Sequence, residues 1–346
     1  MTSYKVKLVP SEHEFTVHED QSVLDAALKA GIVLPYSCRS GTCSTCKGRI
    51  AEGSWDAGAA PESILEPSEL AAGHTLLCQA RPRSDLVVEA DIVRMADDIE
   101  VRKMPGRVME IETLAPDVRR LYLQLPASQP VRYYPGQYLE FILRDGRRRS
   151  YSMANVPSDS NLVELHIRHM PGGAFTDHVF GAGDTQMKIR EIQRVEAPLG
   201  SFFLREDTTA PIIFLVSGTG FAPIKAIVEH MLEAGTQRPA VLYWGGRRPH
   251  DLYLDELPRQ WESLLPDFQY VPVISEALPE DDWQGRTGFV HHAVMEDFPD
   301  LSAHQVYACG TPIMVESARR DFIRHNALPE DAFFADAFTS EADVVV

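Results

Sequence analysis

No stretch of this 346-residue chain approaches the roughly 20 consecutive apolar residues that a membrane-spanning helix needs. The first residues, MTSYKVKLVP, lack the apolar segment and cleavage site of a secretory signal peptide. Basic residues are also few, because 33 Lys and Arg stand against 50 Asp and Glu and leave a net charge of −17. Nucleic-acid binding requires the opposite balance. These absences predict a cytoplasmic protein with no membrane or nucleic-acid partner.

Cysteine is scarce as well, with five residues, but four of them fall within the first 78 positions. Cys38, Cys43 and Cys46 follow the order C-x4-C-x2-C, and Cys78 comes later in the same segment. This is the plant-type spacing of the four thiolate ligands of a [2Fe–2S] cluster. Structural zinc usually takes two C-x2–4-C pairs, and only one is present. Disulfides are disfavoured in a reducing cytoplasm.

Small residues within CRSGTCSTC would let the backbone curl around such a cluster and direct N–H groups at its sulfurs. Before this loop, two alternating runs predict a hairpin, and Ser22 is expected to cap a short helix that ends near Gly31. The segments LLCQA and DLVVEA are expected to form a further strand pair. We therefore predict an iron–sulfur domain over residues 1–96 and a linker over 97–104.

Short strand-like runs separated by turn residues follow from Arg107 and predict an antiparallel β-barrel over residues 105–207. Within it, Arg149 and Tyr151 would share one face of a strand. An arginine can bind a phosphate with two hydrogen bonds, and a phenol ring can stack on a flat heteroaromatic. Ser152 can hydrogen-bond a ring nitrogen. The four-residue motif R-x-Y-S is short and would also arise by chance in many β proteins.

The segment PGGAFT, residues 171–176, precedes the expected start of a short helix. Exposed N–H groups at a helix N-terminus, with the Thr176 hydroxyl beside them, are suited to a pyrophosphate. A simple capped turn is the alternative explanation. Taken together, this segment and R-x-Y-S indicate a flavin site.

The remainder, residues 208–346, alternates strands and helices and predicts a doubly wound parallel sheet that binds its ligand at the carboxyl ends of the strands. Gly218, Thr219 and Gly220 open a glycine turn, and Pro223 stands early in the next helix, where its missing N–H costs little. The motif departs from G-x-G-x-x-G because a proline occupies the region of the third glycine.

The order R-x-Y-S, G-x-x-T and GTG resembles the ferredoxin–NADP⁺ reductase superfamily. The resemblance implies that Arg149, Gly173 and Thr176 hold the FAD diphosphate, and that Tyr151 and Ser152 contact the isoalloxazine. A pyrophosphate site implies FAD rather than FMN, since FMN has only one phosphate. The domains implied are a β-grasp ferredoxin domain, an antiparallel flavin-binding β-barrel and a doubly wound nucleotide-binding domain.

By the same resemblance, Cys309 and Gly310 match a Cys-Gly pair beside the nicotinamide, and Asp336 and Phe338 in FFADAF are expected near the flavin. A buried cysteine without a catalytic role would also fit Cys309. The residues expected at the reacting rings are Cys309, Tyr151, Ser152 and Asp336. Further cofactor contacts are expected at His169, Ala174, Gly218, Thr219, Gly220, Pro223, Arg247, Arg248 and Gly310.

The three sites form a consistent electron path. A nicotinamide gives two electrons as a hydride and an iron–sulfur cluster accepts one electron at a time, and a flavin can exchange electrons with both because it takes up two and releases them singly. LPYSCRSGTCSTC, HIRHMPGG and GTGFAPIK are similar to reductases of Rieske-type aromatic oxygenases such as terephthalate dioxygenase. Similar reductases serve a pyridoxamine-phosphate enzyme in deoxysugar synthesis or a diiron hydroxylase. Because no Rieske or diiron ligand set is present, the final acceptor is expected on another polypeptide.

Arg247 and Arg248 could bind a 2′-phosphate or be ordinary surface residues, and we favour NADH over NADPH. A colourless zinc or redox-sensing scaffold is the remaining alternative, and it would not be reduced by NADH. The predicted protein is thus an NAD(P)H-dependent oxidoreductase with FAD and a [2Fe–2S] cluster, and its partner is a one-electron-accepting protein.

Overall fold

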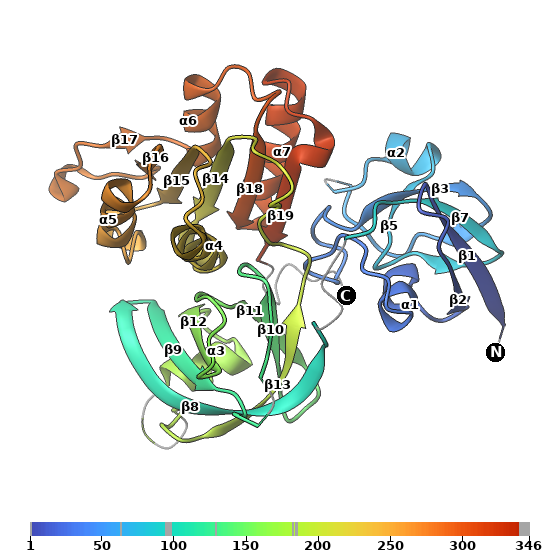
Figure 1. The fold of residues 1–346 in the computed structure, drawn as a ribbon, viewed down its shortest axis with the longest axis horizontal. Coiled ribbons are helices and arrows are strands. Elements are labelled where there is room, and N and C mark those ends of the chain that lie inside the picture. The colour runs from blue at the N-terminus through green and yellow to red at the C-terminus, as the bar shows by residue number, and fades with distance from the viewer. Residues whose placement is uncertain are drawn as a thin grey trace. The chain divides into compact units, whose positions relative to one another are not determined.

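The computed structural model describes residues 2–62, 64–93, 99–128, 130–181, 183 and 186–338 (Figure 1). Residues 97–335 form the larger of two compact units, and the rest of the chain forms the smaller. Within the described residues, no helix has the length and apolar character needed to cross a bilayer. Residues 97 and 98 of the expected linker lie outside the described part, and the strand that follows already begins at Arg102.

The smaller unit is built on a five-stranded sheet in the order β2-β1-β7-β3-β5. Strands β1 and β7 are parallel, whereas β1–β2, β3–β7 and β3–β5 are antiparallel. The segments LLCQA and DLVVEA were expected to pair with each other; that expectation was wrong, because β5, which ends at Leu76, and β7 each pair with β3 instead. The elements are β1 (Ser3–Val9), β2 (Glu14–His18), α1 (Val23–Lys29), β3 (Lys47–Glu52), β4 (Trp55–Asp56), α2 (Pro67–Ala71), β5 (His74–Leu76), β6 (Arg81–Pro82) and β7 (Leu86–Glu89).

Helix α1 begins as the sequence predicts. The Ser22 hydroxyl accepts a hydrogen bond from the Asp25 N–H at 3.1 Å, an N-cap that contributes about 1 kcal/mol to helix stability. Val23, Leu24 and Ala27 are fully buried, so one face of the helix packs on the sheet. The helix therefore gives the cysteine loop that follows it a fixed starting point.

The barrel of the larger unit has six antiparallel strands in the order β11-β10-β13-β8-β9-β12. An antiparallel bridge between Met153 and Leu165 joins the two ends of this order. The elements are β8 (Arg102–Ala115), β9 (Val118–Gln124), β10 (Tyr138–Ile142), β11 (Arg148–Ser152), β12 (Leu162–Arg168), α3 (Ala174–Phe180) and β13 (Ile192–Leu199).

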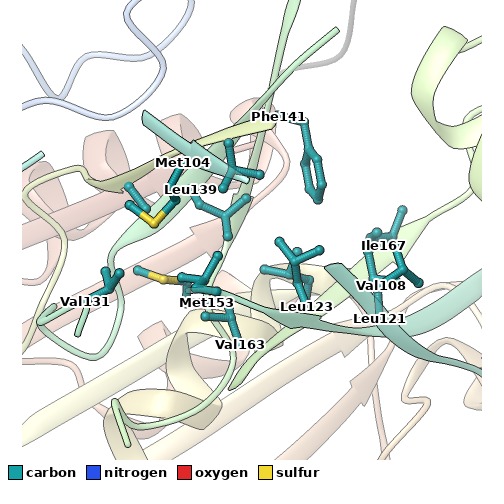
Figure 2. Packing of buried hydrophobic residues seen from close by; sticks show 14 of the residues in the cluster. Met104, Val108, Leu121, Leu123, Val131, Leu139, Phe141, Met153, Val163 and Ile167 are labelled. Carbon is teal, nitrogen blue, oxygen red and sulfur yellow. The ribbon is translucent and has the colours of Figure 1, made fainter. Parts of the chain in front are cut away.

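Apolar side chains fill the inside of the barrel. Leu121, Leu123, Met153 and Val163 are at most 1% exposed and lie between the strands (Figure 2). Burying a side chain of this size contributes roughly 1.5–3 kcal/mol relative to leaving it in water. The alternation of apolar and polar residues in these strands is thus explained by one face that turns inward.

The nucleotide-binding part of the larger unit has the strand order β17-β16-β15-β14-β18-β19, with parallel pairing from β17 to β18. After β14, the chain first builds one side of the sheet and later returns to build the other, so β14 and β18 flank a topological switch point. The elements are β14 (Ile212–Ser217), η2 (Gly218–Gly220), α4 (Phe221–Ala234), β15 (Ala240–Gly246), η3 (Pro249–Asp251), α5 (Glu256–Leu264), β16 (Phe268–Ile274), η4 (Pro279–Asp281), β17 (Arg286–Thr287), α6 (Val290–Asp297), β18 (Gln305–Gly310), α7 (Pro312–His325), η5 (Glu330–Ala332) and β19 (Phe333–Ala337).

Helix α4 lies between this sheet and the barrel, and α6 and α7 lie on the opposite face of the sheet (Figure 1). The predicted architecture, with a ferredoxin-type domain, a flavin-type barrel and a doubly wound parallel sheet, is confirmed.

Candidate functional site

Four cysteine side chains gather in the smaller unit. Cys38, Cys43 and Cys46 lie between α1 and β3, and Cys78 follows β5. The Cys43 thiol donates to Cys38 Sγ at 3.1 Å, and the Cys46 thiol donates to Cys78. The hydrogen bond from Cys43 lowers the pKa of the Cys38 thiol. Two pairs of soft sulfur donors fit a cluster of two irons held by four thiolates.

The backbone of the cysteine loop directs N–H groups at these sulfurs. The Ser40 N–H donates to Cys38 Sγ at 3.4 Å, and the Gly41 N–H donates to Cys78. Gly41 has a φ of 81°, and a Cβ there would stand 2.9 Å from a side-chain carbon of Gln79. The glycine therefore permits both the turn and the close approach that the loop needs.

Arg149 and Tyr151 of the first flavin motif lie on one face of β11, as strand alternation requires. The Tyr151 ring packs edge-on against Phe141 with centroids 5.8 Å apart, and it contacts Phe175 of α3 at 5.3 Å. Burial raises the pKa of Tyr151, so its phenol stays protonated. Ser152 is buried at the end of the strand. The contact with Phe175 brings the two flavin motifs together.

The second flavin motif forms a tight turn before α3. The Thr176 hydroxyl donates to the Met170 carbonyl at 2.8 Å and accepts from the Met170 N–H at 3.2 Å. A Cβ on Gly173, the N-cap residue, would stand 2.7 Å from Thr176 Oγ1, so glycine is what permits this closure. Ala174 is exposed at the first position of the helix. The hydrogen bonds of Thr176 with Met170 close the turn, and the turn lies next to the Tyr151 ring through Phe175.

The glycine turn and the Cys-Gly pair meet at the carboxyl ends of β14 and β18. A Cβ on Gly220 would stand 2.2 Å from the Cys309 carbonyl oxygen, and one on Gly310 would stand 2.1 Å from Ser217 Oγ. Gly310 also has a φ of 145°. Cys309 itself is fully buried, and Thr219 lies between the two turn glycines in η2. The backbones of the two motifs are thus in direct contact at the switch point, where open α/β sheets bind their ligands.

The two arginines after β15 are held by carboxylates. Arg248 donates from Nε and Nη2 to the two oxygens of Asp281, both at 2.7 Å, and lies 3.7 Å from Glu280. Arg247 pairs with Asp251 at 3.3 Å. The Arg248 guanidinium is therefore bound by a carboxylate of η4, whereas the Arg247 side chain faces a carboxylate of η3 and stays 61% exposed.

The other expected contacts are more scattered. Pro223 is buried in the first turn of α4. His169 stacks on Phe180 with ring centroids 4.7 Å apart and hydrogen-bonds Asp177 at 3.0 Å, so it supports α3. Asp336 is buried on β19, and Phe338 is half-buried just after it. The roles of these residues toward the cofactors stay predictions.

Sequence reasoning missed the polar face of β12. Glu164, His166 and Arg168 alternate with the buried Leu165 and Ile167, a pattern that usually indicates a solvent-facing side. Here Glu164 and His166 are 5% and 3% exposed. The HIRH stretch had drawn attention only for His169, and the period-2 pattern alone could not reveal that this face is covered.

Arg168 ends that face beside the glycine turn. Its guanidinium nitrogen Nη1 would be 3.2 Å from a Cβ on Gly218, and the group lies 3.3 Å from Asp117 and 3.6 Å from Asp251. Nε and Nη2 of Arg168 are buried without a hydrogen-bond partner within the described residues. Arg168 is thus a partly buried cation beside the glycine turn, and its present ionic partners are the carboxylates of Asp117 and Asp251.

The geometry thus fits all three groups: paired thiols for an iron–sulfur cluster, an aromatic wall with an adjoining glycine turn for a flavin, and a glycine-lined switch point with Arg168 for a dinucleotide. Comparison with known protein families gives the same result. The 2Fe-2S iron-sulfur cluster binding domain matches residues 6–83, the oxidoreductase FAD-binding domain matches 105–204, and the oxidoreductase NAD-binding domain matches 214–320.

Relatives and solved structures that match almost the whole chain include the following three. A CDP-6-deoxy-L-threo-D-glycero-4-hexulose-3-dehydrase reductase of Yersinia pestis is 40% identical, over 97% of this chain and 98% of the relative. Reductase component 1 of terephthalate 1,2-dioxygenase from Comamonas sp. is 36% identical over 98% of each. The crystal structure of the Amycolatopsis cytochrome P450 reductase GcoB is 33% identical, with a TM-score of 0.76 over 97% of this chain and 99% of that one.

Proposed function

Because this chain belongs to the iron–sulfur flavoprotein reductases of the ferredoxin–NADP⁺ reductase superfamily, we propose that it supplies electrons to a separate Rieske-type oxygenase that acts on aromatic compounds. The enzyme is an oxidoreductase that takes a hydride from NAD(P)H onto FAD and passes single electrons through a [2Fe–2S] cluster. The observation that supports the proposed acceptor is full-length similarity to the terephthalate dioxygenase reductase component.

The bound groups supply the redox chemistry, since FAD exchanges either two electrons or one. The chain's own residues have the task of placing them. We propose that Arg149, Gly173 and Thr176 hold the FAD diphosphate and that Tyr151 and Ser152 border the flavin ring. The contact of Tyr151 with Phe175, at 5.3 Å between centroids, supports a single site made from both motifs.

We also propose that the nicotinamide binds where Gly218–Gly220 touches Cys309 and Gly310, with Arg168 beside the dinucleotide phosphates. The backbone contact at Gly220 and the position of Arg168, whose Nη1 would be 3.2 Å from a Cβ on Gly218, support this placement. The domain limits 1–96, 105–207 and 208–346 are part of the proposal, as is a cytoplasmic location, which the five free thiols support.

A second acceptor is a pyridoxamine-phosphate dehydrase of deoxysugar synthesis. The 40% identity to the Yersinia dehydrase reductase over nearly the full length of both chains favours it specifically. Both acceptors would take single electrons from the same cluster, so the reductase half of the proposal is common to them.

The test has two stages. An anaerobic visible spectrum of the purified protein should show flavin and iron–sulfur bands, and both should bleach when NADH is added. The reduced protein is then mixed with a Rieske aromatic oxygenase or with the CDP-hexulose dehydrase, each with its own substrate. Turnover of the oxygenase alone supports the first acceptor, and turnover of the dehydrase alone replaces it with the second. A colourless protein would contradict the reductase function itself.

We propose that NADH is the preferred nucleotide. An arginine that follows the second strand of a doubly wound sheet can bind the 2′-phosphate of NADPH only if its charge is available. Arg248 is committed to Asp281 through two 2.7 Å hydrogen bonds, and Glu280 adds a second negative charge at 3.7 Å. A 2′-phosphate arriving there would meet carboxylates rather than a free guanidinium.

Asp281→Asn should therefore shift the nucleotide preference. Removal of the charge releases Arg248 and lifts the repulsion of the 2′-phosphate, so kcat/KM for NADPH should rise about tenfold relative to NADH, equivalent to about 1.4 kcal/mol. Steady-state ferricyanide reduction with each nucleotide measures the ratio. Asp282→Asn is the matched control, because it removes the same charge one residue away, from a carboxylate whose hydrogen bond within the described residues is to Gln284. Equal shifts in both variants would attribute the effect to general charge rather than to the Arg248 pair.

A further inference from the structure

The polar face of β12 is the contact between the barrel and the nucleotide-binding sheet within the larger unit. Glu164 and His166 project from the barrel, and Lys225 of α4 and Tyr253 approach them from the sheet side. Lys225 is 6% exposed, although a lysine is almost never fully buried without a partner. Four polar groups thus meet at a place that apolar residues could have filled.

The four groups form one hydrogen-bonded chain. Lys225 Nζ lies 3.2 Å from Glu164 Oε2 and donates to the Ala154 carbonyl of the barrel at 2.9 Å. The other Glu164 oxygen is 2.8 Å from His166 Nε2, and His166 Nδ1 is 2.8 Å from the Tyr253 hydroxyl. Each link beyond the Glu164–His166 pair crosses from the barrel to the sheet.

The charge states follow from the surroundings. Burial raises the pKa of Glu164, but the hydrogen bond from His166 and the charge of Lys225 outweigh it and lower that pKa to about 2. Burial lowers the pKa of His166 despite the opposing effect of Glu164. His166 is therefore neutral, with Nε2–H donating to the carboxylate and Nδ1 accepting from the Tyr253 hydroxyl.

The residues at both ends of this hydrogen-bonded series, Lys225 and Tyr253, are connected to the glycine turn of the nucleotide site. Lys225 stands in the second turn of α4, the helix that begins directly after Gly220. The Tyr253 ring packs edge-on against Trp244 with centroids 5.3 Å apart, and the Trp244 indole N–H donates to the Gly218 carbonyl at 3.1 Å. A displacement of the polar chain would therefore move the glycine turn relative to the barrel.

We propose that Lys225, Glu164, His166 and Tyr253 are positioning residues, which fix the barrel against the sheet so that the nicotinamide and the flavin meet at hydride-transfer distance. Reacting atoms must come within about 3–3.5 Å, and a misplacement of about 1 Å can cost a hundredfold in rate. A buried ion pair contributes little net stability compared with apolar residues of the same size, so its value lies in orientation. The inference rests on the proposed hydride transfer and is independent of the electron acceptor.

Lys225→Met tests it, because methionine fills the volume without the charge. Anaerobic stopped-flow should show flavin reduction by NADH about tenfold slower per bound FAD, since misplacement acts on the reacting distance. Reduction by dithionite and the Kd for NAD⁺ should stay as in the wild type. The primary isotope effect with 4-deuterated NADH should rise. In the FAD-free protein, amide hydrogen exchange in β12 and the first half of α4 should become faster.

Arg286→Met is the control. It removes a cation of β17 that pairs with Glu296 and Asp297 of α6, both in the nucleotide-binding part rather than in the barrel. It should leave the reduction rate unchanged. If Lys225→Met does not fold, Tyr253→Phe removes only the hydroxyl bonded to His166 and should slow flavin reduction in the same direction. Normal rates per bound FAD in the folded variants would overturn the inference, whereas a wild-type protein that NADH cannot reduce would instead overturn the proposed function.

Discussion

Replacement of Cys43 by serine is expected to abolish electron transfer to one-electron protein acceptors. Cys43 is 1% exposed and its thiol lies 3.1 Å from that of Cys38, so its loss breaks one of the two sulfur pairs. A serine hydroxyl is a hard donor that stays protonated near neutral pH and does not replace a thiolate on iron. NADH-driven reduction of cytochrome c should fall to background, and the iron content should fall with it.

The same variant should still reduce ferricyanide with NADH, because the R-x-Y-S, G-x-x-T and GTG motifs belong to the other unit. Cys309→Ser provides the reciprocal comparison: it should keep the iron and slow both reactions, since Cys309 stands at the glycine turn. Loss of ferricyanide reduction in Cys43→Ser with FAD still bound would contradict a path in which the cluster comes last.

Gly220→Ala is expected to destroy use of the nucleotide. The new methyl group would stand 2.2 Å from the Cys309 carbonyl oxygen and 2.9 Å from the Gly310 nitrogen, both backbone atoms that no rotamer change can move. The turn must therefore separate from β18, and the kcat/KM for NADH should fall by about a hundredfold or more, as for a displacement near 1 Å. The FAD content should remain, because the barrel residues are not touched.

Gly235→Asn is the matched control at the other end of α4. Gly235 has a left-handed φ of 66°, which asparagine tolerates, and apart from its chain neighbours no atom of the described residues lies within 4 Å of its Cβ position. It should keep wild-type kinetics and nearly wild-type stability. A Gly220→Ala protein with normal NADH kinetics would show that contact between the two motifs is dispensable, and the nucleotide site would have to be placed elsewhere.

Local patterns predicted most of the fold. Cys38, Cys43 and Cys46 are so close in the sequence that their sulfurs must lie near one another in the loop. Ser22 marks the start of α1 through a hydrogen bond with Asp25, three residues later. The strands of the barrel and the parallel sheet were visible in their alternation and in their apolar runs. In each case the signal lies within about ten residues of its effect.

Contacts distant in the sequence were not predictable in the same way. Glu164 looked like a solvent-facing strand residue, and only the approach of Lys225, 61 residues later, explains its burial. The hydrogen bonds between Arg248 and Asp281 join residues that are 33 positions apart, so they depend on where the fold places η4. The pairing of β5 and β7 with β3, rather than with each other, also depends on how the sheet is ordered and not on either segment alone.

The polar chain across β12 also sets how such reductases can be recombined. A chimera that joined the barrel of this protein to the nucleotide-binding sheet of a homologue without a lysine at position 225 would leave the buried Glu164 carboxylate without its nearer cation, with only Arg120 at 3.8 Å among the described residues. Loss of one partner of a buried ion pair typically costs several kcal/mol. Exchange of residues 97–335 as a block keeps both partners of the pair. The barrel and the sheet are therefore expected to function best when they are exchanged as one block, with the crossover point before the barrel rather than between the barrel and the sheet.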